Sequence, residues 1–363
     1  MRAADLLEWS TIFRRMRARK PTFISYNLTN ECNEACPMCS VWQGGGGEEL
    51  TLVELERIFG ELRSFGFRVV EFSGGEPFLR SDIAEVFALV DRLGFFSTVT
   101  TNGTLLTKDK VESLRKVRGL LQLAISLDSL VPETYAALRG RDLLPAVLRN
   151  VDLVAGAGLP LPFKLNMTMN RLNYHETLKI LSYARERGGY LSVFPVTLGV
   201  GFQHRADDAQ FGADAGQRKE MAEMFRHLAR LRRQGEPLWE YSGFYEMAAD
   251  YVLGLPIGPC DAGRLYFDLH ADGALATCVD QLPFADLRTE SVSTSMKRRD
   301  AQQQNIRRCA ADTPCCYTCT ANISLTARHL FAFFRETAVV RFRAARRART
   351  AARLGNKPAE LHD

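Results

Sequence analysis

Three cysteines near the start of the chain stand close enough in sequence to hold one metal centre. Cys32, Cys36 and Cys39 have C-x3-C-x2-C spacing within the stretch NECNEACPMCSVW. An iron–sulfur cubane normally takes four thiolate ligands, so a loop that offers three leaves one iron open for chemistry. Zinc is the main rival, although a structural zinc site needs four ligands and no histidine lies nearby. A chance grouping of core cysteines is the third alternative, and the tight spacing disfavours it.

The size and composition of the chain are those of an ordinary globular protein. It has 363 residues, 46% hydrophobic and 25% charged, with a net charge of +5. This length suits one large domain and a smaller one. No apolar run approaches a membrane span and the start has no signal-peptide core, so we expect a cytoplasmic protein. Its nine cysteines then point to metal or redox use rather than to disulfides.

Short apolar runs alternate with helical patterns from Thr22 onward, which predicts parallel β/α units. The expected strands are Phe23–Leu28, Val69–Ser73, Phe96–Thr101, Leu121–Leu127, Phe163–Thr168 and Tyr190–Pro195. The expected helices are Leu52–Ser64, Ile83–Leu93, Lys108–Val117, Pro132–Leu138, Leu144–Ala155 and His175–Arg187. Six units are too few for a closed eight-stranded barrel. Beyond Pro195 the pattern becomes irregular, with a loop expected over Gly199–Gly216 and a helix over Arg218–Arg232.

The cysteine motif resembles that of the radical S-adenosylmethionine (SAM) superfamily. The resemblance implies an α/β fold, a partial (β/α)6 TIM-type barrel, followed here by a small α+β cluster-binding domain and a C-terminal basic helix. We expect an amphipathic helix over residues 1–20 that packs on the body as a lid, the barrel over 21–235, the cluster domain over 236–325 and the basic helical tail over 326–363. Contact with a membrane surface is the weaker alternative for residues 1–20. The family's aromatic residue before the third cysteine is replaced by Met38, whose thioether can also pack on an aromatic ring.

The strand ends carry further segments similar to the family's motifs. Ser73–Pro77 is similar to its GGEP motif, Asn102 lies in a segment like its TNG sequence, and Ser126–Ser129 with Arg139 matches patterns frequent in it. By resemblance, Ser126 approaches the SAM ribose, Arg139 its carboxylate, and Asp128 orders the site. A surface salt bridge at a helix end is the alternative for Arg139. The implied SAM-binding residues are Met38, Gly74, Gly75, Glu76, Asn102, Ser126, Asp128 and Arg139, with Asn166 and Asn170 as weaker candidates.

Six cysteines between residues 260 and 319 resemble the family's SPASM and twitch extensions, which hold an auxiliary [4Fe-4S] cluster. Cys260, Gly273 and Cys278 have C-x12-G-x4-C spacing across an expected β-hairpin. Two further complete clusters would need eight thiolates, so we expect one. The assigned ligands are Cys260, Cys278, Cys316 and Cys319, with Cys315 as a substitute for Cys316 and Cys309 left as a structural thiol. Zinc at the same four residues is the alternative.

The resemblance implies an enzyme that cleaves SAM reductively at a [4Fe-4S] cluster to a 5'-deoxyadenosyl radical, which takes a hydrogen atom from a substrate C–H bond. An auxiliary cluster favours an oxidative reaction, a dehydrogenation or a bond formation. The alternatives are a peptide-modifying maturase and a non-catalytic iron–sulfur or zinc protein. The catalytic base stays unassigned, with acidic candidates at Glu246, Asp261, Asp268, Asp272 and Asp280.

The expected partners follow from the same reading. We expect a small-molecule or lipid-like substrate, with a peptide as the alternative, and an external electron donor such as flavodoxin or ferredoxin. The arginine-rich tail over Leu330–Leu354 is a solvated helix by default, and peripheral contact with an anionic membrane or a partner protein is the alternative. Nucleic acid is not expected, because no aromatic stacking platform accompanies the arginines.

Overall fold

Most of the described strands form one open sheet that is mostly parallel. The computed structural model describes residues 3–43, 48–199, 205–258, 260–312 and 314–353. The sheet has nine strands in the order β11-β10-β9-β1-β2-β3-β4-β5-β6. Their bounds are β1 Phe23–Asn27, β2 Val69–Ser73, β3 Phe96–Thr101, β4 Leu120–Ser126, β5 Phe163–Met169, β6 Tyr190–Pro195, β9 Tyr266–Leu269, β10 Ala274–Ala276 and β11 Ala285–Asp286. A separate short pair joins β7 (Thr197–Leu198) to β8 (Arg205–Ala206).

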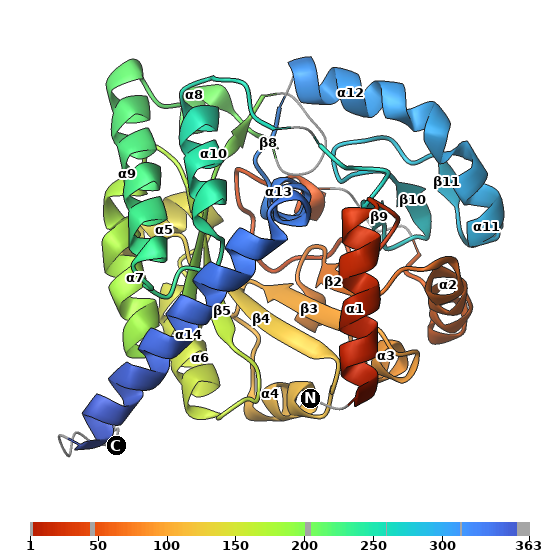
Figure 1. Cartoon of the computed structure of the whole chain (residues 1–363), viewed down its shortest axis with the longest axis horizontal. Helices are drawn as coiled ribbons and strands as arrows, with labels where there is room; N and C mark the ends of the chain where they lie inside the picture. Colours follow the sequence, from red (N-terminus) through yellow and green to blue (C-terminus); the bar gives the residue numbers. More distant parts are fainter. Residues whose placement is uncertain (1–2, 44–47, 200–204, 259, 313, 354–363) are drawn as a thin grey trace.

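Helices connect and cover the parallel strands, which gives the partial barrel that the sequence predicts (Figure 1). Those of the first half are α1 Ala3–Arg17, α2 Leu52–Phe65, α3 Ile83–Arg92, α4 Lys108–Arg115, α5 Pro132–Arg139, α6 Leu144–Gly156 and α7 Thr177–Glu186. Those of the second half are α8 Asp208–Phe211, α9 Ala215–Arg233, α10 Ser242–Val252, α11 Val292–Ser295, α12 Gln303–Asp312, α13 Ile323–Arg328 and α14 Leu330–Arg353. The loop expected before residue 216 contains α8, so that prediction is wrong in part.

The second cysteine region extends the barrel sheet instead of forming a sheet of its own. Strand β9 pairs in parallel with β1, with Phe23 opposite Tyr266 and Ser25 opposite Asp268. Strands β10 and β11 then continue the sheet in antiparallel fashion, so the expected hairpin is present. The fully buried Phe267 of β9 contacts Phe67 with ring centroids 5.7 Å apart. The two parts of the chain therefore share one hydrophobic core.

The N-terminal helix packs on the barrel where the strands begin, opposite the side on which their carboxyl ends lie. Ile12 and Met16 are buried there in a cluster with Val69, the first residue of β2. Trp9 stacks on Phe96, the first residue of β3, with ring centroids 4.9 Å apart. Since catalytic groups of such barrels lie at the opposite, carboxyl end, α1 does not act as a lid over a site there. Within the described part of the chain, no helix combines the length and apolar content needed to cross a membrane.

Replacing Phe267 tests whether the second cysteine region is part of the cooperative core. Phe267→Ala should lower the free energy of unfolding by about 3–5 kcal/mol, because a buried aromatic ring is replaced by a cavity. Leu282→Ala is the control, since Leu282 is 70% exposed and should change stability by less than about 0.5 kcal/mol. Denaturant midpoints measured by circular dichroism compare the two variants. Equal midpoints would show that β9 adds little to the core.

Candidate active site

A cavity of about 240 Å³ opens at the carboxyl ends of the barrel strands. It brings together residues from the ends of six strands, β1 to β6, and from the N-terminal cysteine loop. Seven of the eight predicted SAM-binding residues line it together with all three N-terminal cysteines, namely Cys32, Cys36, Cys39, Met38, Gly74, Gly75, Asn102, Ser126, Asp128 and Arg139. Of the two weaker candidates, Asn166 lines the cavity and Asn170 is buried with its side chain bonded to local backbone.

The cysteine loop is held against the strand β2 end by backbone contacts that need glycine. The Gly75 N–H donates to Thr29 O at 2.8 Å, and the Glu76 N–H donates to Glu31 O at 2.8 Å. A Cβ atom on Gly75 would lie 2.0 Å from Glu31 O, and Gly74 has a φ of +124°. Because no side chain fits between the two segments, the glycines allow the loop carrying Cys32 to approach the strand end.

Arg139 is buried in an ion network and not on the surface. Its Nη2 lies 2.7 Å from Asp128 Oδ2, and its Nη1 lies 3.5 Å from Glu34 Oε2. The side chains of Arg139 and Glu34 are 12% and 1% exposed. Burial lowers the pKa of the guanidinium, but Asp128 and Glu34 outweigh it and raise the pKa well above its ordinary value. Arg139 therefore stays cationic at the cavity wall, and the reading as a surface salt bridge is wrong.

Glu34 is a structural centre of the site that the sequence did not reveal. Its Oε1 accepts a hydrogen bond from Tyr135 Oη at 2.8 Å, and its carboxylate faces Arg139. The loop backbone is fixed to the same helix, because the Ala35 N–H donates to Arg139 O at 3.3 Å. A glutamate between two cysteines in a polar loop has no distinguishing sequence signal. The three-dimensional contacts with α5 are what identify it.

Asp128 orders the fourth and fifth strand ends, as the resemblance implies. Its Oδ1 accepts from the Thr168 N–H at 2.7 Å, and its backbone oxygen accepts from Asn173 Nδ2 at 2.9 Å. Its other carboxylate oxygen faces Arg139. The aspartate thus links β4, β5 and α5 at one point. The role of these residues toward SAM stays a prediction.

Glu76 lies beneath the cavity and does not line it, which corrects its expected place among the SAM-binding residues. The side chain is fully buried. Its carboxylate accepts from Thr101 Oγ1 at 2.7 Å, the Asn102 N–H at 2.7 Å and the Phe78 N–H at 3.0 Å. Burial raises the pKa of Glu76 to about 7, against these three hydrogen bonds, which lower it. Glu76 therefore positions the turn that carries Asn102.

Asn102 connects that turn to the cysteine loop. Its Nδ2 donates to Asn33 Oδ1 at 2.8 Å and lies 4.0 Å from Cys32 Sγ. Asn33 in turn donates to Thr104 Oγ1 at 2.7 Å. The two asparagines and Thr104 fix the first cysteine relative to the β3 end. Asn33, like Glu34, is a residue whose part in the site the sequence alone did not indicate.

Two of the N-terminal thiols hold their protons more tightly than exposed thiols do. Burial raises the pKa of Cys36 to about 12, partly offset by Arg139, whose Nη1 lies 4.0 Å from the sulfur. Burial also raises the pKa of Cys32. A metal binds the thiolate, so loading this site releases protons. The positive Arg139 beside Cys36 offsets part of the negative charge that the thiolates bring.

The donors around the cavity fit a cubane with an amino-acid-bearing nucleotide beside it. Three buried polar atoms of lining residues, Arg139 Nε, Asn166 Oδ1 and Thr197 Oγ1, make no hydrogen bond within the described part of the chain, and a fourth, Asp128 Oδ2, lies in the ion pair with Arg139. A guanidinium N–H is a donor suited to a carboxylate, and an amide oxygen accepts from a hydroxyl or amine. Among the described residues, no three His, Cys, Asp or Glu side chains converge as a single-ion site would require. A cubane does not require this, because each thiolate binds its own iron.

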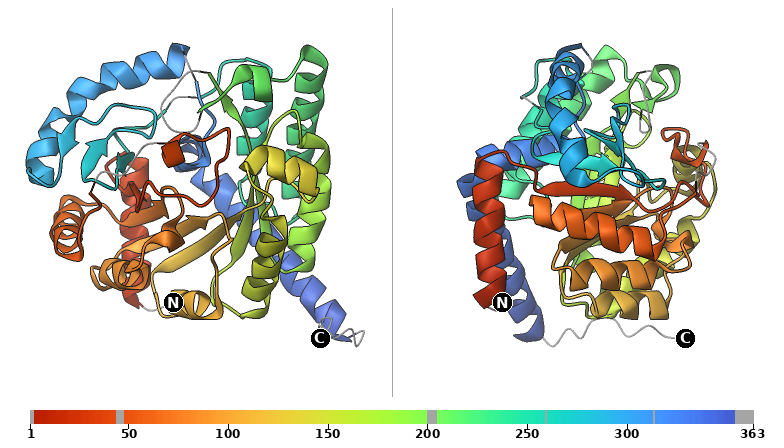
Figure 2. Two further views of the ribbon diagram at one scale, coloured as in Figure 1. Left: turned by 180° about the vertical axis from the view of Figure 1, so that it is seen from behind. Right: turned by 90° about the vertical axis from the view of Figure 1, so that its right-hand side faces the viewer.

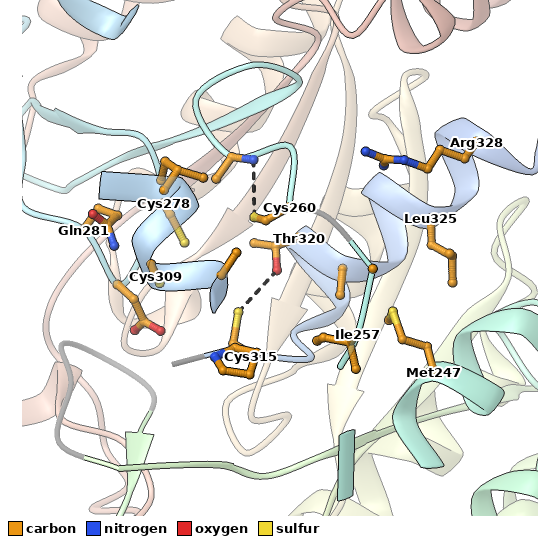
Figure 3. A pocket seen from close by; sticks show the side chains of 17 residues that line it. Met247, Ile257, Cys260, Cys278, Gln281, Cys309, Cys315, Thr320, Leu325 and Arg328 are labelled. Carbon is orange, nitrogen blue, oxygen red and sulfur yellow. Dashed lines mark hydrogen bonds between the residues drawn. The ribbon is translucent and has the colours of Figure 1, made fainter. Parts of the chain in front are cut away.

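Four cysteines of the second group line another cavity, shown in Figure 3. They are Cys260, Cys278, Cys309 and Cys315. Cys260 Sγ accepts from the Ala262 N–H at 3.4 Å, and Cys315 Sγ lies 3.9 Å from Thr320 Oγ1. Burial raises the pKa of Cys315 to about 12 and also raises that of Cys260. This set holds four thiols without any contribution from Cys316.

The expected ligand set needs correction at Cys316. Its side chain is fully buried in the main hydrophobic core and does not line the second cavity, whereas Cys315 does. Adjacent side chains of a non-helical segment point in different directions, so Cys315 and Cys316 cannot both face the second cavity. Cys309, expected to be a structural thiol, lines the cavity as well. The side chain of Cys319 lies outside the described part of the structure.

The two cavities share a wall. Cys278 and Asp280 line the second cavity, while Val279 between them lines the first. In the same way Cys315 lines the second cavity, and Tyr317 and Thr318 line the first. The second cysteine region therefore supplies part of the surface on which a substrate in the first cavity would rest. Of the acidic candidates for a base, none lines the first cavity and Asp280 lines the second.

Comparison with known proteins finds similarity in part of the chain. Residues 26–184 match the model of the radical SAM superfamily. The chain is 34% identical over 172 residues to a probable GTP 3',8-cyclase of Methanothermobacter marburgensis, covering 46% of this chain and 55% of that protein. It is 33% identical over 190 residues to an AdoMet-dependent heme synthase of Methanosarcina barkeri, covering 50% and 52%. The chain thus spans about half the length of the curated relatives it matches.

Solved structures extend the similarity of fold beyond residue 184. The structure of anSMEcpe with bound AdoMet and the Cp18Cys peptide aligns with a TM-score of 0.61 at 15% identity, covering 88% of this chain and 99% of that one. The structure of SuiB from Streptococcus suis bound to precursor peptide SuiA aligns with a TM-score of 0.59 at 15% identity, covering 80% and 69%. At these identities the likeness is one of fold.

The raised pKa of Glu76 predicts a pH dependence of stability. The pKa of Glu76 is 4.5 in the unfolded chain and about 7 in the native chain. Between these two pH values the native state therefore binds more protons at this carboxyl than the unfolded state does. The stabilising contribution of the neutral carboxyl is therefore complete below pH 4.5 and is lost as the pH rises through 7. The stability of the native chain relative to Glu76→Gln should fall across this window, by at most about 3 kcal/mol.

Denaturant unfolding of the two proteins at a series of pH values measures this difference. The control is Glu56→Gln, which removes an exposed carboxylate on α2 paired with Arg92 and should follow the native pH profile. If the difference in free energy of unfolding between the native chain and Glu76→Gln stays constant with pH, the pKa of Glu76 is not raised in the native state.

Proposed function

We propose that the chain is an enzyme of the radical SAM type, because residues 26–184 match the model of that superfamily. It would remove a hydrogen atom from a substrate C–H bond and complete an oxidative reaction with the help of an auxiliary cluster. The [4Fe-4S] cluster with SAM is the cofactor pair of this superfamily, and when bound it supplies the 5'-deoxyadenosyl radical. The observation that carries the proposal is the shared wall, which places four further thiols directly behind the first cavity.

The chain's own residues would hold and orient the cofactors. Cys32, Cys36 and Cys39 would ligate the first cluster, and the buried Arg139 would direct its unsatisfied Nε–H toward the carboxylate of SAM. Carbonyl groups near Gly74 and Gly75 can accept from the ammonium group of the same ligand. Asn166 Oδ1 is suited to the ribose or adenine. Met38 is buried beside the cysteines and can pack on the adenine ring.

The ion network would keep these groups in place while the cofactor enters. Glu34 and Asp128 neutralise Arg139 and fix its direction, so the guanidinium needs no reorganisation when a carboxylate arrives. The buried hydrogen bonds of Glu76 and Asn102 hold the β3 turn and the cysteine loop in register. A preorganised cavity of this kind also limits access of water to a reactive radical.

An oxidative outcome is favoured over a rearrangement because the second thiol set offers a holder for the cluster that would accept the electron released. After loss of a hydrogen atom, a substrate must lose one more electron and one proton to become a closed-shell, oxidised product. The thiol set of Cys260, Cys278, Cys309 and Cys315 is the candidate holder of the cluster that would take this electron. The wall residues Val279 and Tyr317 lie between that set and the first cavity. An external one-electron donor inside the cell, such as flavodoxin or ferredoxin, would reduce the first cluster.

Peptide modification is the second candidate function. The structures of SuiB and anSMEcpe that align with this chain contain bound peptides. The curated relatives are instead named for a GTP cyclase and a heme synthase, and both names denote small-molecule chemistry. The first cavity, at about 240 Å³, is compatible with a small molecule or with one side chain of a peptide. A non-catalytic iron–sulfur or zinc protein would not need the ordered strand-end residues.

Cleavage of SAM tests the proposed activity. Anaerobically reconstituted protein incubated with SAM and dithionite should form 5'-deoxyadenosine, and Cys36→Ala should form none, because the first cluster loses one of its three thiolates. The control is Cys316→Ala, which removes a thiol from the main core outside both cavities and should retain cleavage. Intact clusters without any 5'-deoxyadenosine would support a non-catalytic role.

Iron and sulfide counts test the revised ligand set. The reconstituted native chain should hold about eight irons, four for each of two cubanes. Cys315→Ala should lower the count toward about four, whereas Cys316→Ala should leave it near that of the native chain. If instead Cys316→Ala loses the second cluster and Cys315→Ala keeps it, the original assignment is correct. About four irons in the native chain would indicate one cubane only.

A further inference from the structure

The first and last helices lie on one face of the molecule. Both are on the side that faces the viewer in Figure 1, with α14 running away from α1 toward the C-terminus, and both lie along the same side in the right-hand view of Figure 2. The two helices touch through Phe13 and Phe334, whose rings meet edge to face with centroids 5.0 Å apart. We refer to the outward side of α1 and α14 as the terminal-helix face.

Large apolar side chains are exposed on this face. Phe331 and Phe342 of α14 are 80% and 70% exposed, and Leu7 of α1 is 70% exposed. Phe334 is 43% exposed in addition. Phe331, Phe334 and Phe342 are separated by three and eight residues and therefore fall on one side of a helix. Three exposed phenylalanines along one helix side are an unusual concentration for a surface in contact with water alone.

The charge of the same face is positive. Arg14 and Arg17 are exposed on α1, and Arg335, Arg341 and Arg343 are exposed on α14. The acidic residues with described side chains in the two helices are Glu8, which pairs with Arg63, and Glu336, which is buried. In the sequence, α14 continues with further arginines at positions 346, 347, 349 and 353. The face thus combines aromatic residues with uncompensated cations.

The inner side of α14 is fixed to the body, so the aromatic side cannot turn inward. Glu336 accepts from the Ser242 N–H at 2.8 Å and from Ser242 Oγ at 2.6 Å. Arg232 donates to Thr337 Oγ1 at 2.9 Å. Val340, one turn further, is 1% exposed. These contacts orient the helix and leave Phe331 and Phe342 on its outer side.

We propose that the terminal-helix face binds the surface of an anionic lipid bilayer, with α1 and α14 lying flat on it. Such a surface offers an apolar layer for phenylalanine rings and negative head groups for arginines within one ligand. Nucleic acid would satisfy the arginines but leaves the apolar side chains in water. A second copy of this chain would bring a face of the same positive charge. The lipid surface matches both properties at once.

Vesicle co-sedimentation tests the proposal with the full chain. We expect binding to vesicles of phosphatidylglycerol and phosphatidylcholine, and at least roughly tenfold weaker binding to phosphatidylcholine alone, because several arginines each contribute to attraction by anionic lipid. Raising the salt from about 0.1 M to about 0.5 M should weaken the binding as the charges are screened.

Paired variants separate the apolar and the charged contributions. The double variant Phe331→Ser and Phe342→Ser should bind the anionic vesicles at least roughly tenfold more weakly, because two rings no longer enter the apolar layer. Arg341→Gln with Arg343→Gln should weaken binding and reduce its salt dependence. The matched control is Val53→Ser with Leu282→Ser, which removes side chains 80% and 70% exposed on other surfaces and should bind as the native chain does.

Several outcomes would overturn the proposal. They are no vesicle binding by the native chain, equal binding to neutral and anionic vesicles, or equal loss of binding in the Val53 and Leu282 control. Self-association in analytical ultracentrifugation that the phenylalanine variant abolishes, without vesicle binding, would assign the face to a dimer contact instead. Tight, salt-sensitive RNA binding with no vesicle binding would assign it to nucleic acid. Cleavage of SAM is measured in parallel and should be unchanged in all these variants.

Discussion

A buried set of opposite charges, Arg139 with Glu34 and Asp128, connects the parts of the first cavity to one another. Charges taken out of water are costly unless they are paired and hydrogen-bonded. Here each partner belongs to a different segment, since Glu34 lies in the cysteine loop, Asp128 follows β4 and Arg139 ends α5. Arg139 meets both carboxylates only when all three segments are in place. The requirement for charge pairing thus couples the conformation of a loop without regular structure to that of the barrel.

The barrel could be predicted from the sequence because its signals are local. Each of the six strands begins and ends within one residue of the position that its apolar run indicates. The N-terminal cysteines were likewise identified by spacing and the glycines by their resemblance to the GGEP motif, and the structure brings them to one cavity. The sequence did not indicate Glu34, and the expected place of Glu76 was wrong. Both failures arise because the contacts of these residues are with partners 25 to 105 residues away. Sequence spacing carries no information on which buried carboxylate meets which distant donor.

In the second cysteine region, too, the sequence could not predict which side chains meet. Spacing identified Cys260, Cys278 and the downstream group, but the choice between Cys315 and Cys316 depends on side-chain direction in a segment without regular secondary structure. In the structure Cys316 packs in the main core while Cys315 lines the second cavity, which favours Cys315 as the ligand. Likewise, apolar patterns predicted that the terminal helices are amphipathic, but not which of their phenylalanines remain exposed.

The pairing of β9 with β1 also determines whether β1 is an edge strand of the sheet. Alone in the barrel, β1 would be the outermost strand and would present a row of unpaired N–H and C=O groups, which in other proteins templates association between chains. The parallel neighbour covers this row from Phe23 to Tyr26. The barrel of this chain is therefore not a self-contained module. Removing the second cysteine region would leave β1 as an unpaired edge strand. Gain or loss of the second cysteine region in evolution would have required a replacement strand at the same place.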